Sequence, residues 1–103
     1  MRKQLLVAIV CMTSSGASAQ DWTPVLKKWQ ACADGAAARY AKSAEGAPVA
    51  ARLAILSCVA EKKETLEAVK RVESATFAED YIDTLERKYV DVLAVRIIEM
   101  RLH

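Results

Sequence analysis

Two cysteines are the residues of this sequence whose type and spacing point most directly to chemistry. Cys32 and Cys58 flank a turn predicted at 43–48, and each lies about thirteen residues from the centre of that turn. If the flanking helices run antiparallel, a rise of about 1.5 Å per residue places both cysteines at nearly the same height, roughly 20 Å from the turn. A disulfide needs Cα atoms within about 7 Å, so the spacing predicts a Cys32–Cys58 bond.

Other chemistry at these cysteines lacks supporting residues. Neither belongs to a CxxC pair, and the only histidine is His103 at the end of the chain. No CxxCH haem motif or glycine-rich phosphate loop occurs. No serine has a general base near it in the sequence, so no nucleophilic serine is indicated. The carboxylates alternate with lysines, which is typical of a solvated helix face and not of a catalytic pair. We therefore expect no catalytic residue, no bound metal and no cofactor, and hence no enzyme.

The first nineteen residues have the pattern of a signal peptide. Basic residues follow Met1, an apolar run covers 5–12, and small residues end in Ala17-Ser18-Ala19. This predicts cleavage between Ala19 and Gln20. The apolar run is shorter than the roughly twenty residues that span a bilayer. An uncleaved membrane helix is the alternative, whereas lipidation at Cys11 is disfavoured by the bulky residue before it.

Removal of residues 1–19 would leave one small domain at 20–103 with two cysteines. Arg2 and Lys3 would leave with the segment, so the remainder carries thirteen basic and thirteen acidic residues. Without a basic excess, nucleic-acid binding is not expected. Disulfides persist in oxidising compartments, and a domain of this size commonly needs one. We predict a periplasmic or secreted protein without a stable membrane span.

The fold class predicted is all-α: an antiparallel, disulfide-linked helical hairpin followed by a third long helix in a three-helix bundle. Thr23 is predicted to cap the first helix. Gly46, with a positive φ, and Pro48 are predicted to separate the first helix from the second. No further glycine or proline follows, so helix is expected throughout the rest. One continuous helix from Pro48 onward is the competing arrangement.

A break between the second and third helices is predicted at 73–76. Thr76 and Glu79 fit a capping box at the start of the third helix. A turn there would place Leu85 opposite Leu66 and Val92 opposite Val59 in the core. The third helix is acidic early and basic late, as its dipole favours.

Small residues on both arms of the hairpin predict close helix packing. Ala33, Ala36 and Ala37 would meet Ala50, Ala51 and Ala54. Packing at Gly35 is preferred over a ligand slot beside it, which would use Trp29 and Tyr89 to hold a small apolar molecule.

The residues of the hairpin also carry a resemblance. The pattern Trp29-x-x-Cys32, Ala36, Tyr40-Ala41, Pro48, Val49-Ala50 and Cys58 resembles uncharacterised small exported proteobacterial proteins. The resemblance implies a secreted disulfide hairpin and supplies no activity. In size and architecture the chain is similar to periplasmic acid-stress chaperones and small inhibitors. The expected function is therefore protein–protein interaction, chaperone-like or inhibitory, by a monomer or weak homodimer. A carrier of an apolar ligand, or a structural homodimer through the C-terminal helix, is the alternative.

Overall fold

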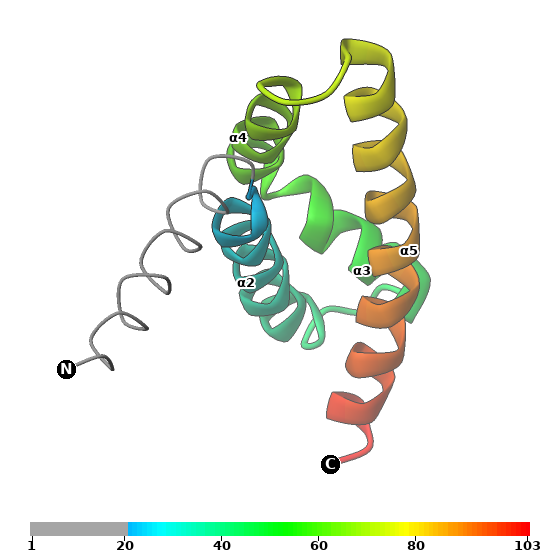
Figure 1. The fold of residues 1–103 in the computed structure, drawn as a ribbon. Helices are drawn as coiled ribbons and strands as arrows, with labels where there is room; N and C mark the ends of the chain where they lie inside the picture. The colour runs from blue at the N-terminus through cyan, green and yellow to red at the C-terminus, as the bar shows by residue number, and fades with distance from the viewer. Residues whose placement is uncertain (1–20) are drawn as a thin grey trace, which may run out of the picture.

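The structure, a computed structural model, describes residues 21–103, and the predicted signal segment with its cleavage site Ala19–Gln20 lies outside this range. The described chain consists of four helices and contains no strand: α2 (Thr23–Tyr40), α3 (Ala47–Leu56), α4 (Val59–Lys70) and α5 (Ala75–Arg101) (Figure 1). The predicted all-α class is therefore confirmed, with four helices where the sequence predicted three.

The first arm, α2, lies antiparallel to a second arm made of α3 and α4. Contacts between the arms pair residues that lie at nearly equal distances from the turn around Gly46. Lys28 Nζ is 3.0 Å from Glu64 Oε1, and Cys32 is bonded to Cys58. Helix α5 packs against all three other helices and runs along one side of the molecule (Figure 1).

The second arm is interrupted at Ser57 and Cys58, where the sequence predicted one uninterrupted helix. The Ser57 hydroxyl donates to the carbonyl of Ala54 at 2.7 Å, an alternative to regular helical bonding that serine readily adopts. Cys58 then leaves helical geometry, with φ −109° and ψ 39°, and precedes the first residue of α4. The break therefore uses local hydrogen bonding rather than the glycine or proline on which the prediction relied.

Two helices start differently from the way predicted. The Asp21 carboxylate accepts from the Thr23 backbone N–H at 2.9 Å, and hydrogen bonding by the side chain and then the backbone of Thr23 lowers the pKa of Asp21. Thr23 is thus the first helical residue and not the cap. At α5 the hydroxyl of Ser74 accepts from Phe77 N at 3.1 Å. The break near 73–76 is where the sequence placed it, but Ser74 and not Thr76 is the cap.

The turn between α2 and α3 also differs from its prediction. α2 ends at Tyr40, and Gly46 precedes α3 with φ −61° and ψ 154°. The positive φ predicted for Gly46 is therefore wrong. Instead, extended backbone leads directly into Ala47 and Pro48 at the start of α3.

The core combines small residues on the hairpin with larger ones elsewhere. All six alanines predicted to pack between the arms are buried, and the large buried side chains are Trp29, Ile55, Val69, Ile82, Leu93 and Ile97. The predicted core pairing of Val59 with Val92 is wrong, because these side chains are 65% and 39% exposed. Leu66 and Leu85 are half-buried against the core.

Candidate functional site

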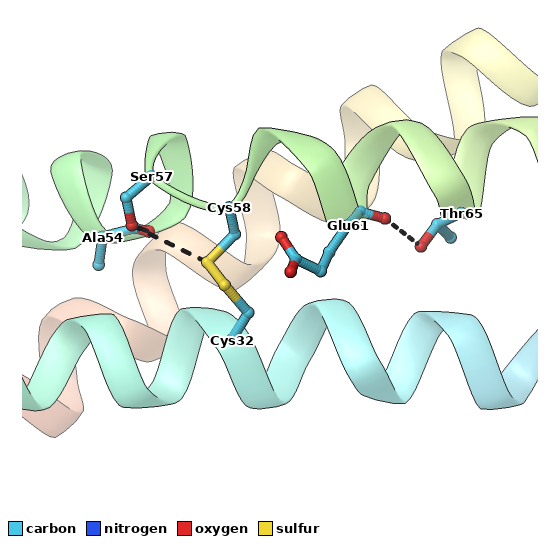
Figure 2. Close-up of a disulfide and its surroundings, with 6 residues drawn as sticks. All are labelled: Cys32, Ala54, Ser57, Cys58, Glu61 and Thr65. Carbon is cyan, nitrogen blue, oxygen red and sulfur yellow. Dashed lines mark hydrogen bonds between the residues drawn. A yellow bond between two sulfur atoms is a disulfide. The ribbon is translucent and has the colours of Figure 1, made fainter.

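The predicted disulfide is present at the centre of the hairpin. Cys32 and Cys58 are bonded with their Cα atoms 6.0 Å apart. Cys58 is fully buried and Cys32 is half-buried. Figure 2 shows the bond crossing from α2 to the junction of α3 and α4. The interruption at Ser57 is therefore also the point at which the second arm is covalently held to the first.

A carboxylate lies beside the disulfide. Glu61 is the third residue of α4, one turn after Cys58, and its side chain extends toward the two sulfurs (Figure 2). One carboxylate oxygen and the two sulfurs all lie within 4.8 Å of one another. Because Cys58 immediately precedes the helix, these three groups gather at the N-terminal end of α4, where helix N–H groups favour negative charge.

A cavity of about 100 Å³ lies between α2, α3 and α5, and the predicted ligand-site residues Trp29 and Tyr89 both line it. The rest of the lining is Leu26, Gln30, Ala33, Ile55, Leu85, Lys88 and Val92. Trp29 is only 3% exposed, and its Nε1 has no hydrogen-bond partner among the described residues. A buried donor without a partner is costly, and among the described residues that line the cavity only Trp29 has such a donor.

Gly35, the third residue of the predicted site, lies elsewhere. It is exposed on α2, and a methyl group added to it would meet no atom within 4 Å. Gly35 therefore takes part neither in close helix packing nor in the cavity.

A polar cluster joins α2 to α5 next to the cavity. Asp34 Oδ1 accepts from Tyr89 Oη at 2.7 Å and from Arg96 Nη1 at 2.7 Å. Arg96 also donates to Tyr89 Oη at 3.1 Å, and its guanidinium lies 5.8 Å from the Tyr89 ring centroid. Burial raises the pKa of Tyr89, and the negative charge of Asp34 adds to that shift. The cluster fixes the phenol at one edge of the cavity.

Sequence reasoning missed Asp34, Arg96 and Glu61. A partial signal for Arg96 was available: it follows Tyr89 by seven residues, so the two side chains lie on the same helical face. A signal for Glu61 was also available, because Glu61 follows Cys58 by three residues and such residues are neighbours on one helical face.

The chain was also compared with known proteins. No protein-family model, no curated protein and no solved structure matches it. In the described part of the chain, no helix combines the length and the apolar character needed to cross a membrane.

Proposed function

We propose that this protein acts by binding another protein through exposed apolar side chains at the C-terminal end of α5. This apolar end consists of Val92, Val95, Ile98 and Leu102, whose exposed fractions range from 39 to 77%. Val95, Ile98 and Leu102 recur at steps of three and four, so they share one side of the helix. Large apolar side chains gathered on one surface, unlike scattered ones, are typical of interaction sites.

The relative lengths of the helices support the same surface. α5 has 27 residues, or about 40 Å of helix, whereas α2 has 18, or about 27 Å. The C-terminal end of α5 extends past the other helices (Figure 1). A partner helix with its own apolar face fits such a stripe, because side chains at these steps are the usual anchors in helix recognition. A chaperone-like or inhibitory protein would use a surface of this kind without any catalytic group.

Crosslinking and affinity capture of the tagged protein from an envelope extract tests the proposal. We expect a defined partner to be captured with the parent protein and lost with Ile98→Glu. Val49→Glu is the matched control, because Val49 is equally exposed but lies on α3. The proposal would be contradicted if the parent protein captured no partner, or if Ile98→Glu and Val49→Glu captured the same amount.

The alternative occupant is a second copy of this chain, giving a homodimer through the C-terminal helix. Light scattering distinguishes the two, since a concentration-dependent dimer that Ile98→Glu abolishes would identify self-association. Leu93 is unsuitable for this test: it is fully buried, so Leu93→Glu would damage the core.

Export to the periplasm or outside the cell belongs to the same proposal. The signal-like residues 1–19 support it, and so does the disulfide, which would be reduced in most cytosolic proteins. A surface exposed in that compartment would meet other envelope or secreted proteins.

A second candidate function, carriage of a small apolar molecule, is favoured by the cavity and the unpartnered indole N–H of Trp29. The volume of the cavity limits the size of the ligand. Pockets for drug-sized ligands measure about 300–1,000 Å³, and a cavity of about 150 Å³ admits benzene. At about 100 Å³ the cavity would take only a molecule smaller than benzene.

Thermal unfolding in the presence of small ketones and alcohols tests this candidate. A ligand should raise the Tm of the parent but not that of Val92→Phe, because the larger ring would occupy the cavity that Val92 lines. An equal rise for both proteins would count against carriage.

A further inference from the structure

We propose that Cys32 and Cys58, once reduced, form with Glu61 a binding site for a zinc-like divalent cation. The three donor groups come from α2, from the junction between α3 and α4, and from the first turn of α4 (Figure 2). Their ligand atoms already lie within 4.8 Å of one another. No other function proposed for this protein uses Glu61.

The donor set matches the chemistry of zinc. Zn²⁺ takes cysteine sulfur at about 2.3 Å and carboxylate oxygen at about 2.0–2.2 Å, usually in a tetrahedral arrangement. Cα atoms 6.0 Å apart allow two freed sulfurs to separate by side-chain rotation and share one ion. Water would fill the fourth position, reached from the side where Cys32 and Glu61 are half-exposed.

The charge of the complex suits its place in the fold. Two thiolates and one carboxylate around a divalent cation leave one net negative charge. Cys58 directly precedes α4 and Glu61 is its third residue, so this charge would lie at the N-terminal end of the helix dipole, where anions are stabilised. The same position favours the thiolate form that the metal requires.

Conversion of the disulfide form into the metal-bound form balances in atoms and electrons. A dithiol reductant gives two electrons and two protons to the Cys32–Cys58 bond, forming two protein thiols while the reductant becomes a disulfide. Binding of the cation then displaces both thiol protons to solvent. The oxidised pair has no thiolate to offer, so the site exists only after reduction.

Metal titration of the reduced protein tests the site. The full chain carries Cys11→Ser, so that Cys32 and Cys58 are its only thiols. It is reduced under anaerobic conditions with a phosphine, which takes up oxygen from water as the disulfide is cleaved. Co²⁺ serves as the probe, because thiolate ligation gives a charge-transfer absorption, and Zn²⁺ competes for the same position.

We expect the reduced protein to bind one equivalent of Co²⁺ that Zn²⁺ displaces, while the oxidised protein binds none. Glu61→Gln should weaken binding by at least about tenfold. Glu64→Gln, one turn further along α4, should leave the affinity unchanged. Circular dichroism recorded on the same samples should show the helical signal throughout.

Three results would overturn the proposal. The reduced parent could give no charge-transfer absorption. Glu61→Gln could bind Co²⁺ as tightly as the parent, which would leave the carboxylate without a role. Binding could also occur only in a chain that has lost its helical signal, which would reduce the effect to two thiols of an unfolded polypeptide.

Discussion

Arg101, in the last turn of α5, holds the turn between α2 and α3. Its Nε donates to the carbonyl of Ala41 at 2.9 Å, and its Nη2 donates to the carbonyls of Ser43 at 3.2 Å and Glu45 at 2.7 Å. Carbonyls beyond a helix end lack backbone donors, and the planar guanidinium serves several of them at once. One side chain therefore anchors a turn that has no positive-φ glycine to shape it.

Arg101→Ala should destabilise the protein by about 1 kcal/mol, because four charge-assisted hydrogen bonds at an exposed position are lost, one of them a long bond to the carbonyl of Tyr40. For a domain of this size that corresponds to a fall in Tm of about 4–8 °C in thermal unfolding. Arg87→Ala is the control, since its exposed ion pair with Asp83 should contribute less than 1 kcal/mol. Equal Tm values for the two variants would refute the anchoring role.

The phenol of Tyr89 predicts an alkaline limit to stability. Its pKa is raised in the folded state, first by burial and then by Asp34, so the folded protein retains the phenolic proton longer than the unfolded chain does. The resulting stability is complete below about pH 10 and is lost as the pH rises through the raised pKa. Tyr89→Phe should therefore show a smaller decline of Tm between about pH 9 and pH 11 than the parent. Parallel declines would disprove this assignment.

The sequence revealed some of these residues and concealed others for physical reasons. Cys32 and Cys58 could be paired because helical rise converts sequence distance into height. Asp34 and Arg101 could not be assigned roles, since an exposed charge on one helix resembles every other until its distant partner is known. Their partners lie more than fifty residues away along the chain.

At the level of elements, the capping of α5 offers a direct comparison between two neighbouring hydroxyl residues. The Ser74 hydroxyl accepts from Phe77 N, so Ser74→Ala should cost about 1 kcal/mol. Thr76→Ala lies inside the helix and should have little effect or a small stabilising one. Urea unfolding of both variants measures the difference. A larger loss for Thr76→Ala would restore the capping box that the sequence suggested.

The disulfide between α2 and the second arm should supply a large share of the stability. It closes a loop with a sequence separation of 26, for which chain-entropy arguments give roughly 3 kcal/mol. A small domain has a total stability of about 5 kcal/mol or slightly more. Replacing both cysteines with serine should therefore lower the Tm by about ten degrees or more, while the helical signal survives at low temperature.

Alkylation of the native protein provides an independent check on that bond. No reaction is expected at Cys32 or Cys58 until a reductant is added. Free thiols in the native protein, or a double serine variant that melts with the parent, would show that the arms do not depend on the bond.

Helix identity was easier to predict than helix continuity. The absence of glycine and proline after Pro48 correctly indicated helix, but it also suggested that the second arm was unbroken. The Ser57 hydroxyl donates to the Ala54 carbonyl where α3 ends. A serine can make such a bond within a helix or at its end, so its presence in the sequence does not reveal a break. By contrast, Ser74 lies within a stretch already recognised as a break, so only the identity of the cap was wrong.

For the molecule as a whole, processing at the N-terminus is the broadest prediction. Intact mass spectrometry of protein from the envelope fraction should give a chain beginning at Gln20, with or without cyclisation of that glutamine. A retained Met1, or a lipid on Cys11, would contradict export by the predicted route. A chain that begins at Gln20 would also justify the choice of an envelope extract for the capture experiment on the apolar end of α5.

The alanines buried between α2 and α3 restrict which substitutions this sequence can accept during evolution. Six of them, three on each helix, are almost completely enclosed: Ala33, Ala36, Ala37, Ala50, Ala51 and Ala54. A larger side chain at any of these positions must force packed backbones apart, at about 1–3 kcal/mol, whereas glycine weakens the helix by about 1 kcal/mol. Distant relatives should therefore keep small residues at these six positions while their surfaces diverge. A search weighted toward that spacing around two cysteines would detect ancestry that overall identity conceals.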